Sequence, residues 1–259
     1  MIKALFFDID GTLVSFKTHT IPASTIEAIN AAKQKGVKIF IATGRCRRFI
    51  NNLKSIEHLI DGYMTANGGY CYIGQRDVCL HTIDRDDVEK IMDYCDHKHT
   101  SCIVVGTSKV SGIHLEKAEH MFGPLLQESI EQWKSPLEEV LEQDIIQLTP
   151  FLTTDEEAEL MPQLHSVVSA RWYPTFSDMT GLGADKGQGL VAMARAEGFD
   201  VSETMAFGDG GNDVPIIREA GIGVVMGNAM DDVKAEADYV TSSVDEDGIK
   251  LALQHFGVI

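Results

Sequence analysis

Near its start the chain reads Ile2-Lys3-Ala4-Leu5-Phe6-Phe7-Asp8-Ile9-Asp10-Gly11-Thr12. The apolar run predicts a buried strand, and side chains two residues apart share a face of an extended chain, so the carboxylates of Asp8 and Asp10 come together at its end. Gly11 permits a sharp turn there, and Thr12 can fix that turn by hydrogen bonding. The pattern suits a nucleophile and a general acid/base for metal-assisted phosphoryl transfer. A strand followed by an ordinary Asp-Gly turn is the alternative.

A second acidic segment follows another apolar run near the far end of the chain. Residues 204–208 have strand composition and lead into Asp209-Gly210-Gly211-Asn212-Asp213. Because parallel α/β sheets bind ligands at the carboxyl ends of their strands, these acids are expected to meet Asp8 and Asp10 in space. Four converging carboxylates repel one another, and Mg²⁺, which prefers hard oxygen ligands, removes that repulsion. An acidic, glycine-rich surface loop is the alternative.

Two further segments offer donors for a phosphate group. The predicted strand over residues 37–42 ends in Thr43-Gly44-Arg45, which supplies a hydroxyl, an accessible backbone N–H and a guanidinium at a predicted helix start. Helix starts of this kind bind anions. Lys186 opens a second helical pattern, and its ammonium can neutralise a phosphoryl group and the acids around it. A solvated surface lysine is the alternative for Lys186 taken alone.

The order of these motifs along the chain is more specific than any one of them. Asp-x-Asp-Gly-Thr, Thr-Gly-Arg, Lys186 and Gly-Asp-x-x-Asn-Asp together resemble the motifs of the haloacid dehalogenase superfamily, and more narrowly those of its Cof-type sugar-phosphatase branch. The resemblance covers nearly the whole chain and includes Asn67-Gly68-Gly69 and Gly227-Asn228-Ala229.

The resemblance implies a role for each motif. It makes Asp8 the nucleophile and Asp10 the general acid/base. Together with the donor chemistry above, it gives a phosphate-binding set of Thr43, Gly44, Arg45, Lys186 and Asn212. The implied Mg²⁺ site comprises the Asp8 carboxylate, the Asp10 backbone carbonyl, Asp209 and, through metal-bound water, Asp213.

The predicted elements indicate an α/β protein, with a doubly wound parallel-sheet core and an inserted α+β cap. Core strands are expected over residues 2–8, 37–42, 60–65, 204–208, 222–226 and 238–241. Core helices are expected over residues 22–35, where Ser24 and Glu27 have the spacing of a capping box, and over 46–56, 185–197, 212–219, 231–236 and 245–255. Residues 70–81 predict a hairpin.

Between these two halves the pattern changes. Residues 83–182 mix predicted helices (84–96, 137–142, 154–161) with strands (101–106, 110–115, 145–152, 165–173, 175–179). We therefore expect a catalytic core of residues 1–82 and 183–259 and a cap of residues 83–182. In the family that the chain resembles, a cap inserted at this point covers the active site and determines substrate specificity.

Composition restricts the partners. The 259 residues carry a net charge of −17. Residues 83–182 hold 7 Lys/Arg and 19 Asp/Glu, so 7 − 19 = −12 of that charge lies in the expected cap. Nucleic acids need a basic surface and are not expected as partners. The acidic cap instead suits a small monophosphate whose charge is neutralised locally.

The remaining sequence features predict a cytoplasmic protein that is a monomer or a weak homo-oligomer. No apolar run reaches the ~20 residues of a membrane span, and Met1 leads directly into a predicted strand, without a signal peptide. The five cysteines lack paired metal-ligand spacing and are expected to be reduced, small hydrophobic residues.

The function that these observations favour is Mg²⁺-dependent hydrolysis of small phosphomonoesters, above all hexose phosphates, through an aspartyl phosphate. Two alternatives remain. A sugar phosphomutase would use the same nucleophile and acid but return the phosphoryl group to a sugar. A non-catalytic sugar-phosphate sensor would keep the pocket without turnover. Arg45 and Asp178 are candidates for reading the leaving group.

Overall fold

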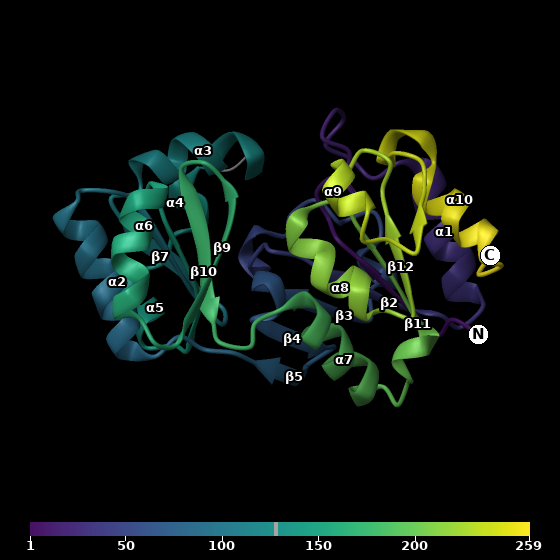
Figure 1. Cartoon of the computed structure of the whole chain (residues 1–259), viewed down its shortest axis with the longest axis horizontal. Helices are drawn as coiled ribbons and strands as arrows, with labels where there is room; N and C mark the ends of the chain where they lie inside the picture. Colours follow the sequence, from purple (N-terminus) through teal and green to yellow (C-terminus); the bar gives the residue numbers. More distant parts are fainter. Residues whose placement is uncertain (127–128) are drawn as a thin grey trace. The chain divides into compact units, whose positions relative to one another are not determined.

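The computed structural model describes residues 1–126 and 129–259 and divides into two compact units, each with its own sheet and hydrophobic core (Figure 1). The first unit comprises Met1–Gly44, Ile50–Cys79 and Asp185–Ile259. The second comprises Arg45–Phe49 and Leu80–Ala184. The second unit thus includes a short segment, Arg45–Phe49, that the sequence pattern assigned to the core.

The first unit is built on an eight-stranded sheet with the strand order β13-β12-β11-β1-β2-β3-β4-β5. Strands β13 to β3 pair in parallel, and β4 pairs antiparallel with β3. The chain order reverses between β1 and β11, and this switch point is where doubly wound sheets bind ligands. The strands are β1 (Ala4–Phe7), β2 (Lys38–Ala42), β3 (Gly62–Thr65), β4 (Tyr70–Ile73), β5 (Arg76–Leu80), β11 (Thr204–Gly208), β12 (Ile222–Val225) and β13 (Tyr239–Val240). The predicted fold class is confirmed.

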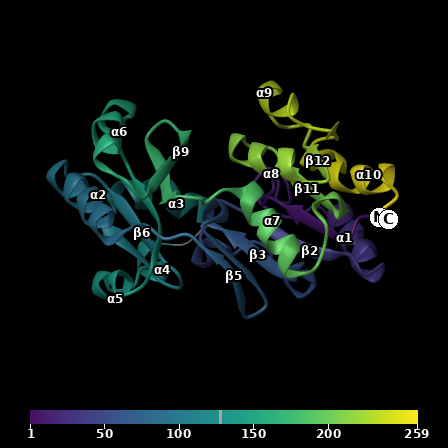
Figure 2. The same ribbon diagram turned by 60° about the horizontal axis from the view of Figure 1, so that its bottom comes forward.

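Helices cover both faces of this sheet because successive side chains of a buried strand point to opposite faces. Leu5 and Phe7 of β1 share a hydrophobic cluster with α1 (Ala23–Gln34) and α10 (Gly248–His255). Ala4 and Phe6 share a second cluster with α7 (Lys186–Ala196) and α8 (Val214–Glu219) (Figures 1 and 2). The short helix α9 (Asp231–Lys234) follows β12. Because every residue of β1 is apolar and buried, the strand packs against a helix layer on each of its two faces.

The second unit contains a five-stranded sheet with the order β7-β6-β8-β10-β9, whose strands pair antiparallel. Its strands are β6 (Cys102–Gly106), β7 (Val110–Ile113), β8 (Ile145–Pro150), β9 (Val167–Tyr173) and β10 (Phe176–Gly181). Helices α2 (Arg85–His97), α5 (Leu137–Leu141) and α6 (Thr154–Leu160) lie along one side of this sheet in Figure 2 and share one hydrophobic cluster with it. The elements predicted for residues 84–179 are thus present.

Two helices of this unit were not predicted, namely α3 (Glu116–Leu126) and α4 (Ile130–Trp133). The sequence of α3 contains Gly123 and Pro124, which are typical of a break in a helix, and α4 is a single turn. Across the described parts of the chain, none of the helices is both long enough and apolar enough to cross a membrane.

The predicted capping box of Ser24 and Glu27 is wrong. Helix α1 begins immediately after Pro22, whose carbonyl accepts the N–H groups of Thr25 and Ile26 at 3.1 and 3.2 Å. Ser24 therefore lies inside the first turn and cannot cap it. Its hydroxyl is buried and has no hydrogen-bond partner among the described residues.

The helix predicted over residues 46–56 is also wrong. Residues Arg47–Phe49 form only a 3₁₀ turn, and a second one follows at Glu57–Leu59. The Arg45 guanidinium donates to the Phe49 carbonyl at 2.8 Å, and the Phe49 ring packs edge-on against Trp133, 5.0 Å away between ring centroids. These contacts override the local helical periodicity. No α-helix therefore begins at Thr43-Gly44-Arg45 to bind an anion.

Candidate active site

The first carboxylate motif lies at the switch point of the eight-stranded sheet. Asp8 follows β1 directly, and its N–H donates to the Phe207 carbonyl of β11 at 3.0 Å, so the parallel pairing holds its backbone. Gly11 then turns the chain with a φ of 87°. A Cβ at this position would lie 2.2 Å from an oxygen of Asp209, so any side chain at residue 11 would displace that carboxylate.

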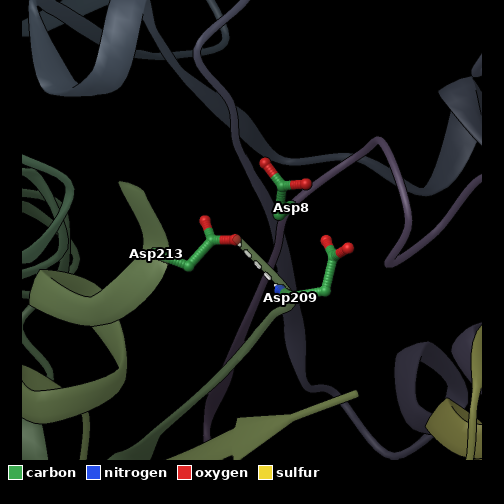
Figure 3. A group of neighbouring side chains, drawn as sticks. All are labelled: Asp8, Asp209 and Asp213. Carbon is green, nitrogen blue, oxygen red and sulfur yellow. Dashed lines mark hydrogen bonds between the residues drawn. The ribbon is translucent and has the colours of Figure 1, made fainter. Parts of the chain in front are cut away.

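Three carboxylates converge at this edge of the sheet. Figure 3 shows Asp8 after β1, Asp209 after β11, and Asp213 in the 3₁₀ turn Gly211–Asp213. One oxygen from each lies within 4.8 Å of the others. Residues more than two hundred positions apart in the sequence thus form one acidic cluster, as the two strand-end motifs predicted.

Lys186 is the positive charge of this cluster. It is the first residue of α7, whose N-cap Asp185 accepts the N–H of Gln188 at 2.9 Å. Its side chain is fully buried, and its ammonium lies 2.7 Å from Asp8 Oδ1 and 2.5 Å from Asp213 Oδ1. Burial alone would lower the pKa of Lys186, but the charges of Asp213 and Asp8 outweigh it and hold the pKa above its usual value.

One lysine does not neutralise the site. Burial, followed by the charge of Asp213, raises the pKa of Asp8 well above its usual range. Burial and Asp213 likewise raise the pKa of Asp209 to about 7. The protein alone therefore leaves these carboxylates crowded and short of positive charge, which is the condition that a bound cation relieves.

Neighbouring donors hold the Asp209 and Asp213 carboxylates in place. The Thr12 hydroxyl donates to Asp209 Oδ1 at 3.1 Å, and Asn228 Nδ2 donates to Asp209 Oδ2 at 3.2 Å and to the Gly11 carbonyl at 2.9 Å. The N–H groups of Asp209 and Gly210 donate to Asp213 Oδ2 at 3.0 and 2.9 Å. Thr12, expected to fix only its own turn, instead connects the two motifs.

The predicted phosphate-binding residues divide between the units. Thr43 and Gly44 end the first unit's β2 segment, and the Thr43 carbonyl accepts the N–H of Asn67 at 3.0 Å. Asn212 Nδ2 donates to Asn67 Oδ1 at 3.0 Å. Arg45 belongs to the second unit. Hydrogen bonds therefore connect Thr43 with Asn212 through Asn67.

Asn67 and Asn228 carry more of the site's hydrogen bonding than the sequence indicated. Both lie in motifs that the chain shares with the family it resembles. The sequence alone predicts no function for either, because a single Asn is also common in turns. The sequence feature that could have indicated both residues is a neighbouring glycine, because glycine indicates an irregular backbone. It occurs in Asn67-Gly68-Gly69 and in Gly227-Asn228-Ala229.

Comparison with known proteins is consistent with this geometry. The sequence profile of the haloacid dehalogenase-like hydrolases matches residues 5–253. The chain belongs to this family. It is 30% identical to the 5-amino-6-(5-phospho-D-ribitylamino)uracil phosphatase YcsE of Bacillus subtilis (strain 168), over 98% of this chain and 96% of that protein.

Two solved structures of this family share the fold over the whole chain. The subclass IIB sugar phosphatase BT4131 is 46% identical, with a TM-score of 0.90, over 99% of this chain and 100% of that one. The phosphatase BT1666 from Bacteroides thetaiotaomicron is 35% identical, with a TM-score of 0.86, over 100% of this chain and 96% of that one. The protein is therefore a phosphatase of the Cof-type haloacid dehalogenase branch and acts on small phosphate substrates.

Proposed function

We propose that this haloacid dehalogenase-like enzyme is a Mg²⁺-dependent phosphatase of small sugar phosphates, above all hexose phosphates, and that it works through an aspartyl phosphate on Asp8. The observation that carries the proposal is the placement of the Asp8 carboxylate. It is buried at the switch point of the sheet, 2.7 Å from the Lys186 ammonium, and it shares its site with two further carboxylates.

The donor set fits Mg²⁺. Three carboxylate oxygens lie within 4.8 Å of one another, slightly wider than the about 4.2 Å that separates opposite ligands of an octahedral ion with about 2.1 Å bonds. Asp8, the Asp10 backbone carbonyl and Asp209 would hold the ion, and Asp213, whose Oδ1 is paired with Lys186, would orient its water. When bound, Mg²⁺ would neutralise charge on the nucleophile and on the phosphoryl oxygens.

In the first half-reaction, a carboxylate oxygen of Asp8 attacks phosphorus in line with the leaving oxygen. Asp10 protonates that oxygen as the ester bond breaks. Lys186 reduces the repulsion between two anions, and Thr43, Gly44 and Asn212 bind phosphoryl oxygens from the neighbouring strand ends. These roles match the burial of Lys186 and the contacts that Asn67 makes with Thr43 and Asn212.

In the second half-reaction, Asp10 takes a proton from a water molecule that attacks the aspartyl phosphate. Phosphate leaves and the Asp8 carboxylate is regenerated. A general acid/base accounts for about 10²–10⁴ of a rate acceleration that can approach 10²¹ for phosphate monoesters. Positioning and electrostatic stabilisation by the other residues must therefore supply most of it.

The similarity to two phosphatases supports a polyhydroxylated substrate. BT4131 is a sugar phosphatase, and the named substrate of YcsE carries its phosphate on a ribityl chain. We propose that the second unit is the cap that reads this part of the substrate through Arg45 and Asp178. The Asp178 carboxylate is buried and accepts a hydrogen bond from the Thr149 hydroxyl at 2.8 Å. Burial raises the pKa of the nearby Cys46 thiol most, the charge of Asp178 raises it further, and the charge of Arg45 lowers it.

A substrate screen tests the proposal. Free phosphate release should be measured over sugar phosphates, nucleotides and cofactor phosphates with Mg²⁺ present, and hexose phosphates should give the highest kcat/KM. Mass spectrometry of acid-quenched enzyme should locate the phosphoryl group on Asp8. Formation of an isomeric hexose phosphate in place of free phosphate would indicate a mutase. Binding without any turnover would indicate a sensor.

Asp178→Asn tests the proposed role of the second unit. It should change the order of the sugar phosphates by kcat/KM, while p-nitrophenyl phosphate is still cleaved.

A further inference from the structure

The turn that follows β3 has an unusual backbone. Ala66, Asn67 and Gly68 have φ angles of 50°, 52° and 94°, so two consecutive residues with side chains occupy the left-handed region before the glycine. Such conformations are uncommon outside glycine and persist only where the surrounding structure holds them. The turn is therefore maintained by its surroundings.

Those surroundings are the proposed phosphate-binding segments. The Asn67 N–H donates to the Thr43 carbonyl at 3.0 Å, and a Cβ on Gly44 would lie 3.1 Å from Asn67 Oδ1. On the other side, a Cβ on Gly68 would lie 2.4 Å from the Asp185 carbonyl oxygen, directly before Lys186. The turn thus fits between the end of β2 and the start of α7.

Among the described residues, the Asn67 side chain forms a hydrogen bond through its oxygen alone. It is 8% exposed, and its Oδ1 accepts the Asn212 amide at 3.0 Å. Its own NH₂ group has no hydrogen-bond partner among the described residues. This NH₂ group is not sealed in the interior, so a ligand that enters the site can reach it and replace water as its hydrogen-bond acceptor.

We propose that Asn67 binds the substrate's phosphoryl group, with its NH₂ donating to a phosphoryl oxygen. The strained turn holds the amide between Thr43-Gly44 and Asn212 so that the donor is oriented before substrate arrives. This inference rests on the proposed function, because it uses the phosphate site of Thr43, Lys186 and Asn212. It adds to that site a residue whose left-handed backbone serves ligand binding and not folding.

The turn offers a matched pair of glycine substitutions. Asn67→Gly relieves the backbone strain and removes the amide, whereas Ala66→Gly relieves similar strain and keeps the amide. Inorganic phosphate binding should be measured for both by titration calorimetry with Mg²⁺ present, together with the melting temperature. We expect Asn67→Gly to melt no lower than the wild type, yet to bind phosphate at least about 10-fold more weakly, because a hydrogen bond to a charged group is lost. Ala66→Gly should bind phosphate within twofold of the wild type.

The conservative variant Asn67→Asp provides a second test if Asn67→Gly fails to fold. It tolerates the left-handed backbone and keeps an acceptor for Asn212, but it presents a negative oxygen where the proposal requires a donor. Its phosphate affinity should fall by more than 10-fold. Wild-type affinity in the folded Asn67 variants, or an equal loss in Ala66→Gly, would overturn the proposal.

Lys186→Met separates this inference from the proposed function. If Lys186→Met loses phosphate binding while Asn67→Gly keeps it, only the role of Asn67 is wrong. If Lys186→Met also binds phosphate as the wild type does, the proposed phosphate site itself is wrong, and the role of Asn67 with it.

Discussion

Both units contain buried aspartates, and the pKa values of Asp87 in one unit and of Asp8 and Asp209 in the other are shifted in opposite directions. Asp87 of α2 is fully buried in the second unit, where it accepts the N–H groups of His165 and Ser166, each at 2.8 Å, and the Ser166 hydroxyl at 2.8 Å. Burial alone would raise the pKa of Asp87, but these hydrogen bonds hold it below its usual value. Asp8 and Asp209 of the first unit have raised pKa values because burial and Asp213 outweigh their partners.

The opposite pKa shifts are those expected of a structural carboxylate, Asp87, and of carboxylates in an active site, Asp8 and Asp209. Asp87 is saturated with donors from its own unit, so its charge stabilises a packed structure and is not available for a ligand. Asp8 and Asp209 lack sufficient positive charge, so we expect a bound cation to complete their interactions. The first unit therefore contains energetically unfavourable charge at the point where chemistry is expected.

The largest expected effect is on turnover by Asp8→Asn. Without the nucleophilic oxygen, phosphate release should fall by at least about 10⁴-fold. The melting temperature should stay the same or rise, because one of the crowded charges is gone while the pair of Lys186 and Asp213 remains. Stopped assays with p-nitrophenyl phosphate and thermal unfolding measure both quantities. Retention of a tenth of the wild-type rate would refute covalent catalysis by Asp8.

Removal of divalent cations should have the next largest effect. Exhaustive dialysis against EDTA should reduce the rate by at least about 10³-fold, and added Mg²⁺ should restore it, because the ion neutralises nucleophile and substrate. Mg²⁺ should also raise the melting temperature of the wild type, since ligands that bind only the folded state stabilise it. Asp209→Asn should remove most of that thermal shift. Full activity after chelation would exclude the proposed metal role.

The acid/base assignment predicts a smaller effect that depends on the leaving group. Asp10→Asn should slow phosphorylation by an alkyl sugar phosphate by about 10²–10⁴-fold. With p-nitrophenyl phosphate the same step should slow much less, because that leaving group hardly needs a proton. Single-turnover rates of the two substrates provide the comparison. An equal loss for both would exclude Asp10 as the acid.

The sequence predicted the parts of the molecule that follow from local pattern. The apolar run before Asp8 and the one before Asp209 gave neighbouring parallel strands, whose ends bring the two acidic motifs together. Lys186 was predicted to open a helix and does so. These features depend on periodicity and on the fact that parallel strands end at one edge, so no long-range contact had to be known.

The features that failed depend on contacts that a local pattern does not contain. The helix expected over residues 46–56 is replaced by turns because Phe49 packs against Trp133, more than eighty residues away. The saturation of Asp87 by donors from residues 165–166 was equally invisible, since one Asp in an acidic helix predicts only a solvated side chain. The roles of site residues remain predictions of chemistry, which the experiments above test.

Asp87→Ala tests whether the hydrogen bonds that Asp87 accepts stabilise the folded protein. Its removal leaves the buried N–H of Ser166 and the part-buried N–H of His165 without their acceptor, so the free energy of unfolding should fall by about 3 kcal/mol. Asp86→Asn, at an exposed position in the same helical turn, is the control and should change it by less than about 1 kcal/mol. Urea denaturation measures both. Equal, small effects would mean that the hydrogen bonds of Asp87 contribute little.

The opposite pKa shifts predict opposite pH dependences of stability, and this is the smallest effect. In EDTA, Asp209 has a folded-state pKa of about 7, above its unfolded value of about 3.9, so its contribution is complete below pH 4 and is lost as pH rises towards 7. Asp87, with a lowered folded-state pKa, contributes its full stabilisation above about pH 4 and loses it as pH falls.

Between pH 5 and 7.5, wild-type protein in EDTA should lose on the order of 2 kcal/mol of folding stability that Asp209→Asn does not lose. Urea denaturation of both proteins across this range measures the difference, and Mg²⁺ should reduce the wild-type slope. If chelated wild type and Asp209→Asn show the same slope, Asp209 is not a crowded carboxylate, and the contrast with Asp87 disappears at that residue.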